Sequence, residues 1–344
     1  MPALAPRPLA IDIGASKLEY ALAGAKGARA RIARIAIPAK MTSGRLVQLI
    51  VRICKKSRAT SLGICFPGFV HDGKVLKLPN LPDVRAFDAK SVLGRKLSIP
   101  VSVENDAKCM ALAVWHARGR KEDDDFIVIA PGSGIGGAIV RNGRLVRGED
   151  NQAGEFGHMK ILLARNAGAS GASGHGGSRG ASGPGPIKEE WEQMCGGFGI
   201  ARRYALALKE KNSTKNKPAL SALPNDARDI SPPMRNPPLF SSLPARDRDA
   251  KHILHSSVPL AKKISNQSAA YFGLGLALIA SALEPREFVI AGSVGAAYVG
   301  PLRKKVTAAF EANASDEAKD TPISPCPIPH PALWGAALLS RYGL

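Results

Sequence analysis

The sequence predicts an α/β protein built from two lobes with a functional cleft between them. Three observations carry this prediction. The chain has 344 residues, more than one hydrophobic core usually organises. Helical and strand patterns alternate along it, which is typical of helices packed on sheets. Glycines and polar residues follow the ends of several expected strands, where α/β proteins commonly bind ligands.

Residues 9–38 alternate apolar with small or polar side chains around Gly14 and Gly24. This pattern predicts two or three strands joined by tight turns, with Asp12 near a strand end. Helical spacing of apolar residues follows at residues 43–57. The next expected elements are a strand at 61–68, a helix at 90–97, a strand at 99–106 and a helix at 107–118.

The second part of the chain opens with residues 123–148, which predict a strand, a glycine turn, a second strand and an Asn-Gly hairpin. Two stretches break the pattern. Residues 166–186 are dominated by Gly, Ala and Ser and predict a flexible surface loop. Residues 209–248 are rich in Pro, Ser and Lys and predict an insertion. The other expected elements are helical structure from Lys188, a helix from Asp249 through Leu283, a strand at 287–292, a helix from Val299 and a final helix from Pro331.

Composition narrows the class of ligand and the compartment. Lys and Arg outnumber Asp and Glu by 48 to 28, a formal charge of +20, which favours anionic ligands such as nucleotides, phosphosugars, nucleic acid or acidic membrane surfaces. The five cysteines contain no CxxC and predict neither a disulfide framework nor a cysteine-rich zinc site. The N-terminus does not resemble a signal peptide, and the longest apolar stretch, 273–283, is too short for a membrane span. We therefore expect a cytoplasmic protein without membrane association.

Two glycine-rich turns are candidates for phosphate binding. Gly132, Gly134 and Gly137 formally match GxGxxG, but a β-branched segment with an Asn-Gly turn follows instead of a helix, so a dinucleotide site is not expected. No P-loop motif is present. The bare backbone N–H groups of this turn could cradle phosphates. The alternative interpretation is an ordinary hairpin turn.

The segment DIGASK at residues 12–17 offers a carboxylate at a strand end, small residues and a lysine. Asp12 could hold magnesium through water; alternatively, it caps a turn while Lys17 is solvated. A third glycine-bearing strand end, VIAGSVG at residues 289–295, could flank an adenine or ribose. Taken alone, it is an ordinary connection between a strand and a helix.

Asn105 and Asp106 end the strand VSVEND and are the strongest candidates for chemistry. A carboxylate there can remove a proton from a hydroxyl as that hydroxyl attacks a γ-phosphate, and the amide can hold other hydroxyls. An Asx turn that caps the next helix is the alternative and is compatible with catalysis. Glu155 and His158 supply an acceptor and a donor three residues apart, a pair that also occurs as a purely structural hydrogen bond.

In this order, these segments resemble the ROK family of sugar kinases and repressors, within the larger group of actin-like and hexokinase-like ATPases. The resemblance covers nearly the whole chain. It rests on DIGASK at 12–17, CFPGFV at 65–70, PNL at 79–81, VENDAK at 103–108, GSGIGGAIVRNGRLVRG at 132–148, AGEFGHM at 153–159 and PALWGAA at 331–337.

The resemblance implies a bilobal α/β fold of the ribonuclease H-like, actin-like ATPase type. Residues 1–118 would form an N-terminal lobe joined by the helix at 331–344, and residues 119–330 a larger C-terminal lobe. It also implies roles for individual residues. Asp106 would be the general base and, with Gly68, Asn105, Glu155, His158 and Glu192, would bind the sugar. The ATP-binding set would be Asp12, Gly14, Ala15, Ser16, Lys17, Gly132, Ser133, Gly134, Gly136, Gly137 and Gly292, with Asp12 associated with Mg²⁺.

The sequence also departs from the family pattern. Many ROK proteins bind structural zinc through the GH histidine, a CxC and one further cysteine in the next loop, but residues 161–187 contain no cysteine. We therefore expect no zinc site, since His175 in the glycine-rich loop cannot replace three thiolates. That loop normally helps to position the sugar-binding glutamate. Lys108 stands where a small polar residue is usual and is expected to lower the pKa of Asp106.

Taken together, the sequence predicts an ATP- and Mg²⁺-dependent hexose kinase, with glucose as the first candidate acceptor, and a homodimer. One alternative is a sugar-sensing protein of the same family that has lost catalysis. Another is a basic protein associated with nucleic acid. Specific DNA binding is not expected, because only eleven residues precede Asp12, too few for the helix-turn-helix of the family's repressors. The sequence leaves polyphosphate open as an alternative phosphoryl donor.

Overall fold

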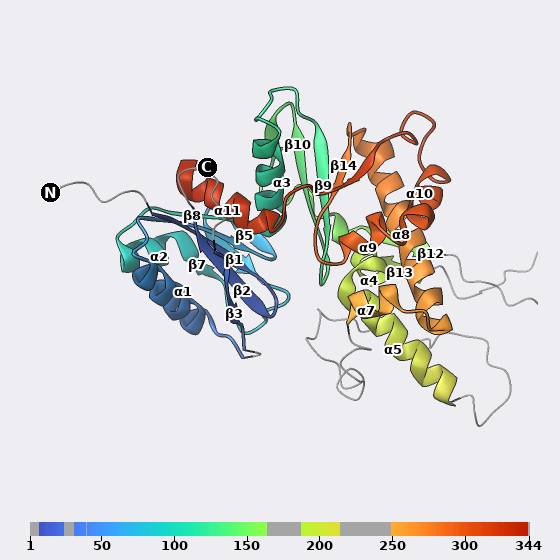
Figure 1. Cartoon of the computed structure of the whole chain (residues 1–344), viewed down its shortest axis with the longest axis horizontal. Coiled ribbons are helices and arrows are strands. Elements are labelled where there is room, and N and C mark those ends of the chain that lie inside the picture. The colour runs from blue at the N-terminus through green and yellow to red at the C-terminus, as the bar shows by residue number, and fades with distance from the viewer. Residues whose placement is uncertain (1–6, 24–30, 39, 164–186, 214–248, 343–344) are drawn as a thin grey trace, which may run out of the picture.

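The computed structural model describes residues 7–23, 31–38, 40–163, 187–213 and 249–342. Two five-stranded sheets, each with its own helices, form two lobes (Figure 1). The predicted α/β class and its two-lobed arrangement are both present. The expected loop at 166–186 and most of the insertion at 209–248 lie outside the described residues.

The first sheet combines an antiparallel hairpin edge with a parallel centre, because β1 pairs antiparallel with β2 and parallel with β4. Helices α1 (Ser43–Ser57) and α2 (Ala89–Leu97) belong to this lobe. The apolar residues of α1 at helical spacing, such as Leu46 and Ile50, are buried in its core. In sheet order the strands are β3 (Ala33–Ala36), β2 (Lys17–Leu22), β1 (Pro8–Ile13), β4 (Ser61–Phe66) and β8 (Val101–Asn105).

The second sheet has the same design: β9 and β10 pair antiparallel, whereas β9, β14 and β15 are parallel. In sheet order its strands are β11 (Arg144–Val146), β10 (Ile135–Arg141), β9 (Phe126–Pro131), β14 (Phe288–Ile290) and β15 (Ile323–Pro325). The helices of this lobe share one large core with the sheet. They are α4 (Trp191–Cys195), α5 (Gly197–Ser213), α7 (Ala250–His255), α8 (Pro259–Leu283), α9 (Gly295–Val299) and α10 (Arg303–Glu311).

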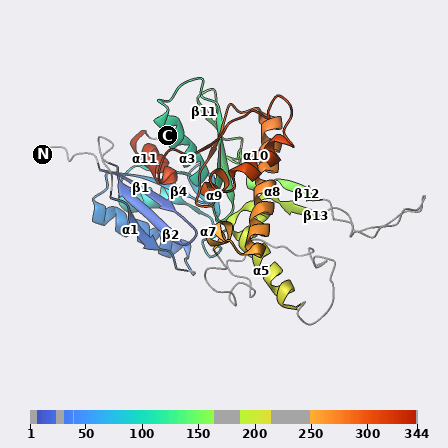
Figure 2. The ribbon, with the colours of Figure 1, turned by 45° about the vertical axis from the view of Figure 1, so that its right-hand side comes forward.

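Two helices lie between the sheets, α3 (Asp106–Ala117) and α11 (Pro331–Tyr342), as both ribbon views show (Figures 1 and 2). Helix α11 packs directly on the first sheet, because a Cβ at Gly63 would overlap the carbonyl oxygen of Ala336. Helix α3 packs Ala107 and other small residues against the second sheet. The expected lobe boundary near Arg118 therefore lies just after α3, a helix that packs against both lobes.

The structure corrects several expected elements. Helical structure does not resume at Lys188, because residues Ile187–Glu190 form strand β13, which pairs with β12 (Lys160–Leu163). The expected helix from Asp249 to Leu283 is two helices, since the chain is extended at Ser256 and Pro259 starts α8. The helix expected from Val299 begins only at Arg303, as α10, and is preceded by the short helix α9, which ends at Val299.

Further differences lie at the edges of the lobes. Helix α5 extends to Ser213, so the first residues of the expected insertion are helical. A small three-stranded sheet, which was not expected, consists of β5 (Phe69–His71), β6 (Lys74–Lys77) and β7 (Phe87–Asp88). Among the described residues, we find no helical segment with the length and apolar character that a membrane span requires.

Candidate active site

A cavity of about 220 Å³ lies between the two lobes. Its walls come from the turn after β1, the end of β8, the turn between β9 and β10, and the start of α4 and α5. Most residues expected to bind sugar or phosphate meet here. They are Gly14, Ala15, Gly68, Asn105, Asp106, Gly132, Ser133, Gly134, Gly136, Glu155, His158 and Glu192.

Asp106 enters this cavity at the junction of β8 and α3. The preceding residue, Asn105, is the N-cap of α3: its Oδ1 accepts the backbone N–H of Lys108 at 3.1 Å, and its Nδ2 donates to the carbonyl of Gly68 at 3.0 Å. Asp106 Oδ1 accepts the N–H of Ala107 at 2.8 Å. The capping interpretation of this motif is therefore confirmed, and it leaves the Asp106 carboxylate at the cavity wall.

The environment of Asp106 makes it a stronger base than an ordinary aspartate. Burial, together with the charge of Asp12, raises the pKa of Asp106 to about 7. A group that titrates near neutral pH is well suited to accept a proton during turnover. Lys108 was expected to lower this pKa, but the net shift is upward, because burial and the charge of Asp12 dominate it.

The glycine turn between β9 and β10 is folded tightly against the start of α5. Gly132 donates its N–H to the carbonyl of Gly134 at 2.9 Å, and the N–H of Phe198 bonds to the carbonyl of Ser133 at 2.8 Å. Gly137 does not line the cavity, because its α-carbon faces the backbone of Gly154. This glycine allows close packing of two chain segments rather than access to a phosphate.

Glu192 lies directly behind the same turn. Its Oε2 accepts the N–H of Ile135 at 3.2 Å, and a Cβ at Gly134 would overlap that oxygen. Burial raises the pKa of Glu192 and of Glu155 above the usual range. The glycine turn and the expected sugar-binding glutamate are therefore one packed unit.

Asp12 lines a second cavity of about 510 Å³, together with Gly292, Glu19 and His330. Cys65 donates its thiol to Asp12 Oδ1 at 3.4 Å. Burial raises the pKa of Asp12 to about 6, despite this bond. A buried carboxylate that ionises reluctantly gains from a nearby cation, and carboxylate oxygens suit Mg²⁺. The donor at Asp12 therefore fits the expected metal.

Besides Gly137, two more residues expected at the nucleotide, Ser16 and Lys17, lie outside both cavities. Ser16 is exposed, and its carbonyl accepts the N–H of Ile37 at 2.8 Å. Lys17 pairs with Glu19 at 2.7 Å. Glu19 is a side chain that the sequence did not single out, and it is also bound by Arg34 and His330 at 2.7 and 2.8 Å.

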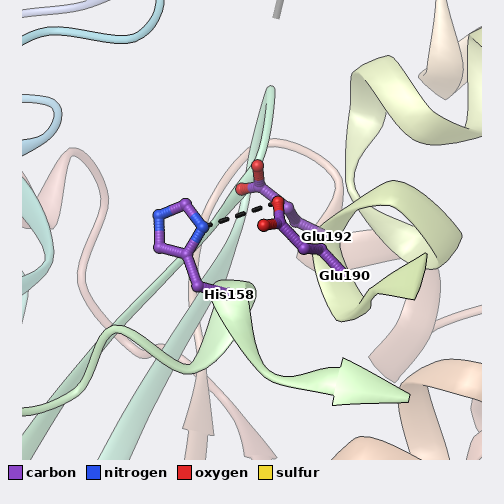
Figure 3. Close-up of side chains that lie close together, drawn as sticks. All are labelled: His158, Glu190 and Glu192. Atoms are coloured by element: carbon purple, nitrogen blue, oxygen red, sulfur yellow. Dashed lines mark ion pairs between the residues drawn. The ribbon is translucent and has the colours of Figure 1, made fainter. Parts of the chain in front are cut away.

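His158 lies between the carboxylates of Glu190 and Glu155. Figure 3 shows its contact with Glu190. Its Nδ1 is 3.6 Å from Glu190 Oε2, and its Nε2 is 3.9 Å from Glu155 Oε2. The ring of Phe69 stacks on the imidazole with centroids 5.9 Å apart. The sequence predicted His158 and Glu155 but gave no role to Phe69 or Glu190.

A network of charged and polar side chains, which was not expected, lies near the start of α3. Glu104 Oε2 pairs with Arg147 at 3.0 Å, and its Oε1 accepts Asn151 Nδ2 at 2.8 Å. Lys108 is fully buried and donates to the carbonyl of Asn151 at 2.8 Å; burial lowers its pKa. The network ties the start of α3 to the loop that leads to Glu155.

Comparison with known proteins identifies relatives over most of the chain. A glucokinase of Halalkalibacterium halodurans is 28% identical over 272 residues, 77% of this chain and 70% of that protein. An N-acetylmannosamine kinase of Escherichia coli O157:H7 is 32% identical over 154 residues, 44% of this chain and 53% of that protein. These relatives are sugar kinases that differ in substrate.

Solved structures match the whole fold. The ROK family glucokinase from Streptomyces griseus, in complex with glucose and AMPPNP, superposes with a TM-score of 0.69 at 22% identity, covering 97% of this chain and 99% of that chain. A ROK family transcriptional regulator gives a TM-score of 0.65 at 19% identity, covering 98% and 79%. The expected actin-like ATPase fold is thus confirmed. Since the ROK family pattern matches residues 8–341, the chain belongs to the ROK family.

Proposed function

We propose that this protein is an ATP- and Mg²⁺-dependent hexose kinase, with glucose as the first candidate acceptor. The observation that carries the proposal is the position of Asp106. It lies in the cavity between the lobes, and its pKa is raised to about 7 by burial and by Asp12. Hydroxyl-binding side chains surround it in the same cavity: Asn105, Glu155, His158 and Glu192. Relatives named glucokinase support glucose as the acceptor. Because another relative is an N-acetylmannosamine kinase, other hexoses are also candidate acceptors.

In the proposed mechanism, the sugar fills the cavity of about 220 Å³. Glu155 and Glu192 accept hydrogen bonds from its hydroxyl groups, and His158 donates or accepts one more. Asp106 takes the proton of the reacting hydroxyl as its oxygen attacks the terminal phosphoryl group. Residues of both lobes line the site, so closure of the lobes on the sugar would exclude water that competes with the hydroxyl.

The phosphates of ATP would lie between the turn after β1 and the turn after β9. Gly14 and Ala15 from the first turn and Gly132 to Gly134 from the second line the cavity on this side. Mg²⁺, when bound near Asp12, would neutralise charge on the transferring phosphoryl group. Gly292 lines the second cavity, where the nucleoside would lie.

The second candidate is a sugar-binding protein without turnover. The observation in its favour is the structural match to a ROK family transcriptional regulator, together with the loss of the family's zinc cysteines from residues 161–187. The two candidates share sugar binding and differ only in phosphoryl transfer.

An ADP-release assay with ATP, Mg²⁺ and a panel of hexoses and N-acetylhexosamines tests the proposal. Wild type is compared with Asp106→Asn and with the matched control Asp316→Asn, whose side chain is 92% exposed and does not line the cavity. Sugar-dependent turnover that Asp106→Asn loses and Asp316→Asn keeps is the expected result. Sugar binding by calorimetry without turnover on ATP or polyphosphate would favour the sensor instead.

A further inference from the structure

We infer that Glu190, held in place by Lys160, fixes the orientation of His158, the histidine through which many similar proteins bind structural zinc. The inference rests on the proposed function, in which His158 contacts the sugar. Glu190 would thus be a positioning residue, acting on the substrate only through the imidazole.

The strand pair β12–β13 places the three side chains together. Lys160 and Glu190 are direct partners in the antiparallel register of these strands. Lys160 Nζ donates to Glu190 Oε1 at 2.7 Å, while Glu190 Oε2 is 3.6 Å from His158 Nδ1. Each oxygen of the carboxylate therefore faces one nitrogen. Figure 3 shows the Glu190 carboxylate directed at the imidazole.

The other contacts of His158 restrain its ring only in part, so the Glu190 carboxylate is needed to fix its orientation. Phe69 restrains the face of the ring, and Glu155 is near Nε2 at the cavity. The side chain of His158 is 43% exposed, so close packing does not hold its edge. Of the two carboxylates, Glu190 is the nearer, at 3.6 Å from Nδ1 against 3.9 Å between Glu155 and Nε2, and it is paired with Lys160, whereas burial raises the pKa of Glu155. The charge at Nδ1 therefore prevails and favours the proton on that nitrogen. Nε2 is then directed toward the cavity as an acceptor for a sugar hydroxyl.

Lys160 also favours the ionised form of Glu190. Burial opposes its ionisation, but the hydrogen bond and charge of Lys160 lower the pKa of Glu190 below its usual range. The adjacent Glu189 is different: it pairs with Arg202 at 3.6 Å. Two neighbouring glutamates on one strand thus have separate partners, and Glu189 provides a matched control.

The residues here do not fit the zinc site of similar proteins. The donor atoms of His158, Glu190 and Glu192 lie within 4.8 Å of one another. However, the ammonium group of Lys160 is bound to Glu190, and Glu192 accepts the N–H of Ile135. A divalent cation would have to displace or repel that lysine. No thiolate compensates, since the thiol of Cys195, the cysteine nearest in sequence, bonds to the carbonyl of Trp191 within the core.

The test compares Glu190→Gln, Lys160→Met and the control Glu189→Gln. NMR of ¹⁵N-labelled histidine reports which ring nitrogen of His158 carries the proton, with the signal assigned from a His158→Gln spectrum. In wild type and Glu189→Gln we expect the Nδ1–H form. In Glu190→Gln the Nε2–H form should gain, and the KM for sugar should rise roughly fivefold, the scale of a partly exposed ion pair. The KM for ATP and kcat should change less than twofold, and Lys160→Met should show the same pattern more weakly.

Two results would overturn the inference. One is an unchanged tautomer in Glu190→Gln together with a sugar KM equal to that of Glu189→Gln. The other is one zinc ion per chain by elemental analysis, with sugar affinity lost on chelation. If wild type phosphorylates no sugar, the proposed function fails, but the tautomer measurement still decides whether Glu190 orients His158.

Discussion

Replacing Asp106 by asparagine should lower turnover but raise the stability of the fold. The variant keeps the size of the side chain and an oxygen that can accept the N–H of Ala107. The cap of α3 is supplied by Asn105 and is untouched. The substitution therefore removes the proton acceptor without removing a structural contact. Since a positioned general base contributes about 10² to 10⁴ in rate, kcat should fall by that factor.

The same change should stabilise the fold. Burial and the charge of Asp12 raise the pKa of Asp106 from its ordinary value of 3.8 to about 7, which corresponds to a cost of at most roughly 4 kcal/mol for ionising it in the folded state. The sign follows from proton binding. Between these two values the folded state holds the proton that the unfolded state has lost, so wild type loses stability as the pH rises through this range. Asparagine has no such dependence.

Thermal unfolding at pH 8 and pH 5, alongside kcat, is the assay. At pH 8 we expect the Tm of Asp106→Asn to exceed that of wild type by a few degrees, at about 2 °C per kcal/mol for a chain of this size. At pH 5 the difference should be much smaller. A variant that retains more than a tenth of wild-type turnover would remove Asp106 as the base. Equal Tm differences at both pH values would refute the raised pKa.

Three further predictions follow from the same contacts. Gly134→Ala places a methyl group against Glu192 and should raise the KM for sugar about tenfold or more. Gly132→Ala is the control, because no atom lies near its Cβ, and it should leave this KM unchanged in steady-state kinetics. The value of kcat/KM should fall about tenfold per pH unit below pH 7 as Asp106 is protonated, and a flat profile to pH 5.5 would exclude this base. Glu19→Gln should lower the Tm at pH 7, because burial opposes the charge of Glu19 but bonds from basic side chains hold its pKa at about 2; the loss is at most about 3 kcal/mol, and it should shrink as the pH falls from 4.5 to 2.

The sequence predicts those parts of the structure that depend on local pattern. Apart from the small sheet of β5, β6 and β7, the strands and helices up to Ala117 were expected within a few residues, because each has a clear period and a turn or cap at its end. The break between α7 and α8 was missed because the apolar spacing continues across it. Strand β13 was missed because its pairing with β12 joins residues far apart in the sequence.

In the candidate site, too, some features follow from local sequence pattern and others depend on residues distant in sequence. Gly14, Gly68 and Asp106 could be expected to meet, since they follow the ends of parallel strands of one sheet. The roles of individual glycines could not be assigned, because Gly134 and Gly137 occur in one motif but face Glu192 and Gly154, respectively. The burial of Lys108 was also beyond prediction. A lysine is almost never fully buried unless it is paired, and its partner loop is distant in sequence.

The distribution of charge links the stability of the cleft to its function. The chain carries a formal +20, yet the two cavities contain Asp12, Asp106, Glu155 and Glu192, and burial raises the pKa of each. These carboxyl groups are poorly solvated and repel one another, which costs the free protein stability. Hydroxyl donors of a sugar and a cation near Asp12 would relieve part of that cost on binding. In the proposed kinase, the net positive charge would attract the anionic nucleotide, while the acidic residues of the cavities would supply the acceptors for the sugar and for its proton.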